Sequence, residues 1–146
     1  MSGGPSMVSV RQGGASYSSL PAVHGMVAGA LDGLGLPGDF IRPGDKVVLK
    51  PNWVKEHDER FPGPDQWEHV VTHPAVIEGV IAWVAPKLQG EGSIVICDAP
   101  QTDSSFATLR RYCGLDAMIG RCRERWPSLR IELLDSTAGP SARVRV

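Results

Sequence analysis

The chain has 146 residues, with 15 Lys and Arg against 16 Asp and Glu, and its formal net charge is −1. This length suits one domain with a substantial core. The balanced charge gives no field that would attract nucleic acid or an anionic membrane surface, so we expect neither partner. No apolar run approaches the roughly 20 residues that span a bilayer, and residues 1–19 lack the apolar stretch of a signal peptide. We expect a cytoplasmic protein.

Three cysteines stand far apart in the sequence, at Cys97, Cys113 and Cys122. Their odd number and the absence of a C-x-x-C pair argue against a disulfide framework, and we expect reduced thiols. No run of cysteines could ligate an iron–sulfur cluster, so such a cofactor is not expected in this chain.

The first 20 residues are rich in Gly and Ser. We predict a flexible N-terminal segment over residues 1–20, with a short strand at Met7–Val10, followed by a single domain over residues 21–146. From Leu20 to Leu36 the apolar residues recur at helical spacing and predict a helix with one buried face. The glycines at 33, 35 and 38 match G-x-G-x-x-G, but they end a helix instead of joining a strand to a helix, so we reject a dinucleotide fingerprint.

The central stretch of the chain is Asp45–Val54, an aliphatic run that stops at Pro51. Three consecutive aliphatic residues without polar alternation favour a strand covered on both faces, as in parallel sheets. Proline lacks the amide hydrogen that a sheet needs, so the chain leaves the sheet there. Lys50 and Asn52 therefore follow the carboxyl end of this strand, where open α/β sheets bind their ligands.

The rest of the chain alternates helices and strands. Thr72 or His73 is expected to cap a helix that begins at Pro74, and Ser104 or Ser105 a helix that ends at Tyr112. The remaining predicted elements are strands at residues 93–98 and 129–135, a helix at residues 115–125 and a short strand at Ala142–Val146. This order predicts an α/β fold: three layers, a mostly parallel sheet and helices on both faces, Rossmann-like in topology.

Two strand exits, after Leu49 and after Cys97, should open onto one crevice. Asp98 is the best candidate for an acid/base or ligand role, with a helix or turn cap as the alternative. His73 is a second catalytic candidate, with helix capping as its alternative. An anionic small molecule would bind near these residues. The predicted ligand-binding residues are Lys50, Asn52, Trp53, Thr72 and Gln101.

A divalent metal is a further candidate cofactor. His57 and His69 lie in the long connection between residues 51 and 71, near Asp58 and Glu68. Imidazole and carboxylate groups can ligate divalent metals. Loop histidines also serve as capping or solvated groups, and this alternative stays open for both residues.

Three short motifs resemble the "domain of unknown function 362" family. They are Lys50-Pro51-Asn52-Trp53, Val71-Thr72-His73-Pro74 and Ile96-Cys97-Asp98-Ala99-Pro100, and the likeness spans about Asp45 to Asp135. The resemblance implies an α/β domain and, in many members, an added ferredoxin-like module with iron–sulfur clusters. It also implies a longer domain, so we expect either a half-length version completed by self-association or a fragment.

Two hypotheses of function follow. The first is an enzyme, or half of one, that binds an anionic small molecule at the strand exits, with or without a divalent metal. The second is a noncatalytic binding or assembly module that forms a homo-oligomer, or pairs with another chain, through an incomplete sheet edge.

Overall fold

A computed structural model describes residues 6–14, 16–61 and 66–138. It contains three strands, four α-helices and three short 3₁₀ helices within these ranges. The elements are α1 (Leu20–Asp32), β1 (Lys46–Leu49), η1 (Gln66–His69), α2 (Pro74–Val84), η2 (Ala85–Leu88), β2 (Ser93–Asp98), α3 (Phe106–Tyr112), α4 (Leu115–Arg125), β3 (Arg130–Asp135) and η3 (Ser136–Ala138).

The three strands form one parallel sheet in the order β1-β2-β3. Val47 is in register with Ile94, and Ile94 with Ile131, so these side chains lie on one face of the sheet. The register continues to the end of the sheet, where Asp98 pairs with Asp135. The predicted α/β fold with a parallel sheet is confirmed.

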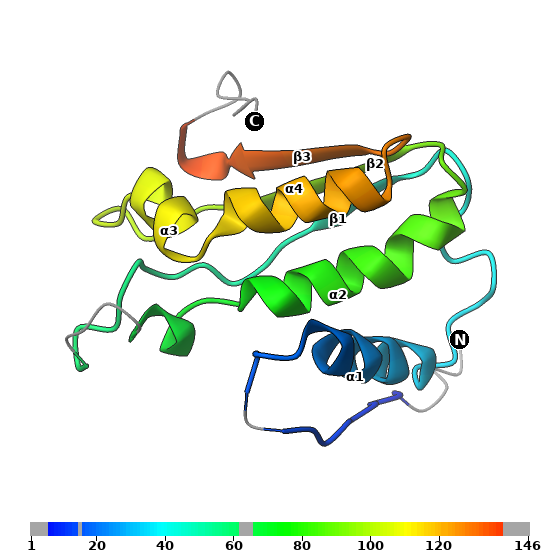
Figure 1. Cartoon of the computed structure of the whole chain (residues 1–146), viewed down its shortest axis with the longest axis horizontal. Coiled ribbons are helices and arrows are strands. Elements are labelled where there is room, and N and C mark those ends of the chain that lie inside the picture. Colours follow the sequence, from blue (N-terminus) through cyan, green and yellow to red (C-terminus); the bar gives the residue numbers. More distant parts are fainter. Residues whose placement is uncertain (1–5, 15, 62–65, 139–146) are drawn as a thin grey trace.

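The distribution of the helices differs from the prediction. Helices α1, α2 and α4 lie side by side in front of the sheet (Figure 1) instead of on its two faces. The strand order explains this result, because two right-handed crossovers that step in the same direction place both connecting helices on the same face. On the opposite face, Val48 of β1 is 56% exposed.

Local signals set most helix limits. The His73 side chain caps α2 and the Ser105 side chain caps α3, which selects one of the two residues predicted at each start. Helix α1 stops at Asp32, four residues before the predicted end, and Gly35 then takes a left-handed backbone conformation with φ +61°. Only glycine adopts this conformation without strain, so the helix cannot run on through it.

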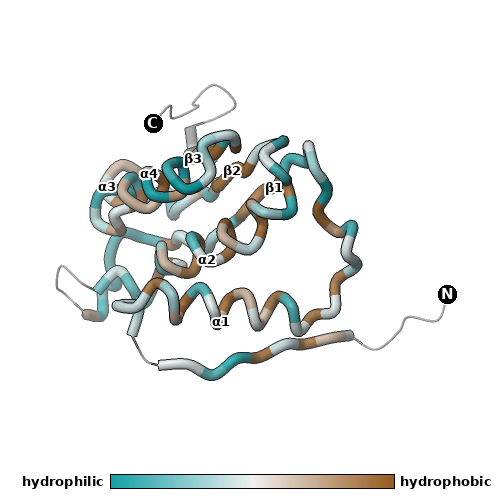
Figure 2. The backbone as a smooth tube through the Cα atoms, turned by 45° about the vertical axis from the view of Figure 1, so that its right-hand side comes forward, coloured by the Kyte–Doolittle hydropathy of each residue, from teal (hydrophilic) through white to brown (hydrophobic). Residues whose placement is uncertain are grey.

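Two predicted strands have different outcomes. Residues 6–14 lie alongside α1 (Figure 2) and form no strand. The predicted strand at Met7–Val10 was therefore wrong, because an isolated extended segment without a partner makes no ladder. The strand predicted at Ala142–Val146 lies outside the described residues.

The hydrophobic core lies between the sheet and the helices α2 and α4. Ile81 of α2, Ile96 of β2 and Ile119 of α4 are fully buried in one cluster. Helix α1 packs against α2 and contributes only Val23 as a buried residue. Its apolar face is therefore incompletely covered. None of the helices described here is both long and apolar enough for a transmembrane span.

The cysteines are free thiols in the described chain, as expected. Burial raises the pKa of Cys113 and of Cys122 to about 12. Such thiols are poor nucleophiles at neutral pH, so both side chains act as small apolar residues of the core.

Candidate functional site

The exits of β1 and β2 meet at one edge of the sheet, as the crevice prediction required. The Lys50 Nζ atom lies 2.8 Å from the Asp98 Oδ1 atom. The two side chains differ in environment, since 70% of the Lys50 side chain and 6% of the Asp98 side chain is exposed. We call this region the strand-exit rim and define it by residues 50–53, 72–73 and 98–101.

Asp98 joins the two exits. Its Oδ2 atom accepts a hydrogen bond of 2.7 Å from the Trp53 backbone N–H, and its Oδ1 atom accepts one of 2.9 Å from the Ala99 N–H. Burial opposes ionisation, but Lys50 and the two N–H donors outweigh it and hold the pKa of Asp98 below its usual value. A carboxylate with three donors is already satisfied inside the chain. This geometry matches the turn-cap alternative for Asp98.

Asn52 and Thr72 bind each other's backbone. The Asn52 N–H donates to the Thr72 Oγ1 atom over 2.9 Å, and the Thr72 N–H donates to the Asn52 carbonyl over 2.8 Å. The next residue, Trp53, forms an isolated antiparallel bridge with Val71. These bonds fasten the beginning and the end of the long connection together. The exposed Asn52 side chain remains available to a ligand.

Trp53 and Gln101 take different positions at the rim. Trp53 is 1% exposed and its ring packs against Phe106, with 5.8 Å between centroids, so it is a core residue. Its Nε1 atom is buried and has no hydrogen-bond partner among the described residues. Gln101 donates its backbone N–H to the Val54 carbonyl over 2.9 Å and is exposed. Of the two predicted ligand-binding residues, only Gln101 can reach a bound molecule without rearrangement.

His73 occupies the start of α2. Its Nδ1 atom accepts a hydrogen bond of 3.1 Å from the Ala75 N–H, and its ring stacks on Tyr17 with 3.9 Å between centroids. Trp67 stacks on it at 5.3 Å. Burial lowers the pKa of His73, although nearby Glu68 opposes this shift. These contacts match the helix-capping alternative for His73.

The candidate metal ligands do not gather. His57 is exposed, and the ring of His69 lies 5.5 Å from that of Phe61. Asp58 is paired with the Arg60 guanidinium, which lowers the pKa of this carboxyl to about 2. Within the described ranges, no group of three or more His, Cys, Asp or Glu side chains is arranged to hold a metal ion.

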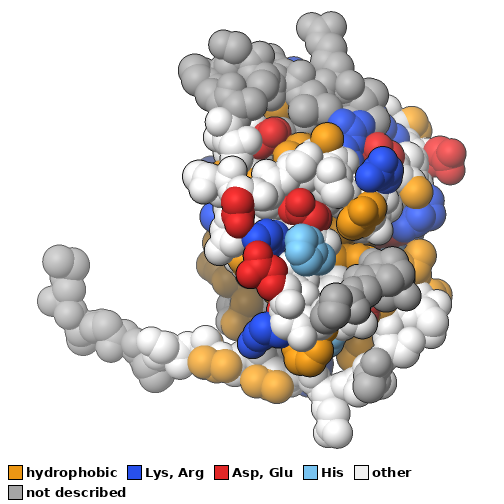
Figure 3. Space-filling model, turned by 90° about the vertical axis from the view of Figure 1, so that its left-hand side faces the viewer, with side chains coloured by type: hydrophobic (Ala, Val, Ile, Leu, Met, Phe, Trp, Pro, Cys, Tyr) orange, Lys and Arg blue, Asp and Glu red, His pale blue; other side chains and the backbone are white. Residues whose placement is uncertain are grey.

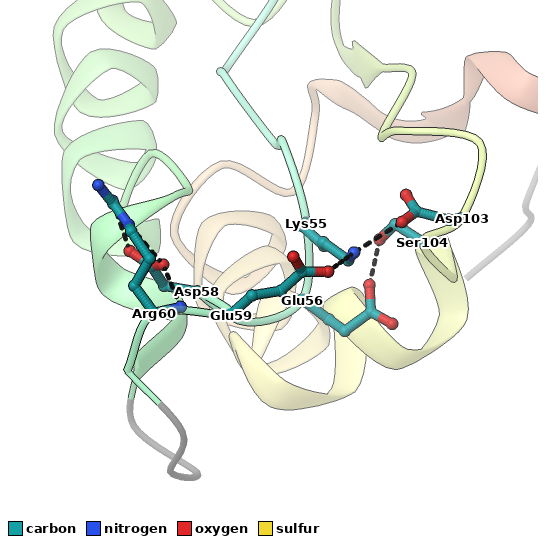
Figure 4. A network of polar contacts seen from close by, with 7 residues as sticks. All are labelled: Lys55, Glu56, Asp58, Glu59, Arg60, Asp103 and Ser104. Atoms are coloured by element: carbon teal, nitrogen blue, oxygen red, sulfur yellow. Dashed lines mark hydrogen bonds and ion pairs between the residues drawn. The ribbon is translucent and has the colours of Figure 1, made fainter.

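A polar network beside the rim was missed by the sequence reasoning (Figure 4). Lys55 Nζ lies 2.7 Å from Asp103 Oδ2 and also binds Glu59. These hydrogen bonds raise the pKa of Lys55. Ser104 donates a hydrogen bond to Glu56. The spacing of Lys55 and Glu59 is a local signal for one pair, but the contacts with residues 103 and 104 bridge two loops 48 positions apart.

Charges of both signs are interleaved at this end of the molecule (Figure 3). Lys50 pairs with Asp98, while Lys55 and Arg60 pair with the carboxylates already described. Paired cations attract an anion only weakly, because the field of each is cancelled by its neighbour. The strand-exit rim is therefore not a concentrated positive site.

Two hollows lie along the free side of β1. Among the described residues β1 pairs only with β2, so backbone N–H and C=O groups on its other side lack a sheet partner. One hollow of about 270 Å³ and one of about 420 Å³ lie beside β1 and share Val48, Leu49 and Val80. We call the two together the edge groove. Its principal lining residues are Leu31, Phe40, Val47, Val48, Leu49, Val76 and Val80.

The edge groove was not foreseen. The incomplete sheet edge of the second hypothesis was not assigned to β1, and the sequence did not indicate that α1 and α2 would extend over this strand. The lining by Leu31 of α1 and Val80 of α2 identifies these helices as the roof of the groove. The apolar spacing of α1 was visible in the sequence, but the spacing could not identify the surface on which this helix packs.

Comparison with known proteins adds no identification: no family model, no curated protein and no solved structure matches this chain. The resemblance to the "domain of unknown function 362" family therefore stays a prediction based on three short motifs.

Proposed function

We propose that this domain is a noncatalytic binding and assembly module, which accepts an extended segment of another chain as an additional strand beside β1. The observation that carries the proposal is the edge groove, an apolar hollow along the free side of the parallel edge strand β1, with a helical roof already in place. An incoming strand would satisfy backbone groups of β1 and cover apolar side chains of α1 and α2 in one step.

The exposure of β1 supports this assignment. Val48 is 56% exposed although it stands in the middle of the strand, and Phe40 at the groove is 59% exposed. The unpaired backbone N–H and C=O groups of an edge strand can pair with another chain. Lys46 and Lys50 flank Val48 at two-residue spacing and are exposed on the same side of β1. A designed probe strand with acidic residues on its outward side could pair with both lysines.

A synthetic peptide tests the proposal. The probe is an acetylated heptapeptide of alternating valine and glutamate, whose valines would face the roof and whose glutamates would face the two lysines. We expect it to bind and to slow amide hydrogen exchange in β1. Val48→Asp should weaken binding by about two- to fivefold, because it places a carboxylate beside the outward-facing glutamates of the peptide.

The matched control is Tyr112→Asp, which changes another exposed apolar residue, 48% exposed and located on α3. This variant should bind the peptide as the wild type does. Equal binding by the wild type and Val48→Asp, or no change of exchange in β1, would contradict a strand-accepting role.

A second candidate function is binding of an anionic small molecule at the strand-exit rim. It is favoured by one observation, the exposed Lys50 ammonium at the mouth of the 270 Å³ hollow, near Thr72. Titration calorimetry with inorganic phosphate and with succinate tests it. Binding that is lost in Lys50→Ala but kept in Lys46→Ala would support this function, and no heat of binding for either anion would count against it.

A further inference from the structure

Residues 6–14 carry large apolar side chains that are strongly exposed. Met7, Val8 and Val10 are 63%, 82% and 79% exposed, the highest values among the exposed large apolar residues in the described chain. The segment is extended and lies outside the sheet. Its apolar side chains are consequently in contact with water, which is unfavourable for each of them.

The segment turns its other side to α1. A Cβ atom added at Gly33 would lie 2.3 Å from the Ser9 Oγ atom, and one added at Gly29 would lie 2.9 Å from the Arg11 Nε atom. Gly13 approaches Met26 still more closely, so the contacts with α1 fall on residues 9, 11 and 13. Successive side chains of an extended chain point to opposite sides. Val8 and Val10 therefore point away from α1.

The edge groove and residues 6–14 have complementary structures. None of the described residues forms a strand in the groove along β1, whereas the segment is an extended chain without a sheet and has two valines on one side. A second copy cannot bring its own β1 to this edge, because the helical roofs of the two copies would occupy the same space. A strand without a helix on that side fits beneath the roof, and the Val8 side of the segment meets this condition.

We propose that residues 6–14 of one copy form a fourth strand beside β1 of a second copy. This inference rests on the proposed function and names the strand that the groove accepts. Val8 and Val10 would contact the second copy's α1 and α2, and the donor's own α1 would cover the opposite face of that sheet, beside Val48. A reciprocal exchange gives a closed two-fold dimer.

Sedimentation analysis between roughly 1 and 500 µM, the range in which modest interfaces associate, tests the inference. We expect the wild type to dimerise. Val8→Asp/Val10→Asp removes the donor surface, Val48→Asp removes the acceptor surface, and each change should weaken dimerisation at least about tenfold. Tyr112→Asp is again the control and should dimerise normally. Circular dichroism verifies that each variant folds, which we expect because all four changed residues are exposed.

Mixing the donor variant with the acceptor variant gives the sharpest result. The acceptor variant keeps an intact segment, and the donor variant keeps an intact groove, so the mixture retains one native interface. We expect a mixed dimer that neither variant forms alone. A mixture that remains monomeric while the wild type dimerises would overturn the exchange of segments.

The outcomes separate this inference from the proposed function. A monomeric wild type overturns the second-copy inference, and peptide binding still decides whether the groove accepts strands. A donor variant that dimerises normally, beside a monomeric Val48→Asp, also overturns the choice of residues 6–14 but leaves the groove in use. Normal dimerisation of Val48→Asp contradicts any role of the groove in self-association.

Discussion

The carboxyl end and the free side of one short strand, β1, differ in whether their exposed groups have partners. At the strand-exit rim, the charged and backbone groups around Asp98 find partners within the chain. Along the edge groove, backbone groups and apolar side chains of the same strand lack such partners among the described residues. The polar residues of the strand-exit rim therefore stabilise the fold, whereas the apolar edge groove is the region where we expect a partner to bind.

The largest effect should come from the buried side of the rim. Trp53→Ala should lower the free energy of unfolding by about 3–5 kcal/mol, because the ring is fully buried against Phe106. Phe40→Ala at the groove is the control and should change it by less than about 0.5 kcal/mol, since this ring is exposed. Urea denaturation followed by far-UV circular dichroism measures both. Similar losses of unfolding free energy in the two variants would contradict the difference in burial between the rim and the groove.

The second-largest effect on the unfolding free energy should come from Asp98. Asp98→Ala leaves the Trp53 and Ala99 N–H groups without their acceptor and should cost about 2–3 kcal/mol in unfolding free energy. Lys50→Ala should cost less than about 1 kcal/mol, because this side chain is 70% exposed and water screens its ion pair. Chemical denaturation of both variants gives the comparison. A larger loss in Lys50→Ala would show that the ion pair, and not the hydrogen bonds, holds the rim.

The pH dependence of stability isolates the Asp98 charge. Its pKa is lowered in the folded protein, so the unfolded state binds a proton at higher pH than the folded state does. Its contribution is complete above the unfolded pKa of about 3.9 and is lost as pH falls through the folded pKa. The stability difference between the wild type and Asp98→Asn should therefore be constant from neutral pH to just above that value and shrink below it. A difference that grows on acidification would contradict the sign of the shift.

A smaller effect is expected at the start of α2. His73→Ala removes the side-chain acceptor for the Ala75 N–H and should cost about 1 kcal/mol. His73→Asn retains a capping acceptor and should cost less than about 0.5 kcal/mol. Thermal denaturation of both variants is sufficient. Equal losses would indicate that the stack with Tyr17 stabilises this region more than the cap does.

The smallest effect on the isolated chain should be at the edge groove itself. Val48→Thr should change the unfolding free energy by less than about 0.5 kcal/mol in dilute solution, because the residue is exposed there. At protein concentrations where the wild type associates, the wild type should gain stability and Val48→Thr should gain less. The difference in unfolding free energy between the two should therefore increase with concentration. Denaturation at two protein concentrations measures this difference, and a concentration-independent result would argue against association through β1.

The sequence alone determined the elements of this protein and their order. Aliphatic runs bounded by Pro51 and by Gly92 specified two strands, and residues with a capping side chain located the starts of α2 and α3 to within one residue, because these signals act over a few neighbouring residues. The meeting of Lys50 with Asp98 also followed, since parallel strands end at a common edge. These features need only local chemistry and the handedness of the connections.

Tertiary structure alone decided how the candidate residues are used. The sequence could not show that Asp98 is satisfied by the Trp53 N–H, that Lys55 pairs with Asp103, or that α1 packs on α2 and covers the free side of β1. Each of these facts depends on which distant surfaces meet. Burial and pairing depend on the folded structure. The same kind of side chain can therefore stabilise the fold or bind a ligand, depending on the residues that surround it.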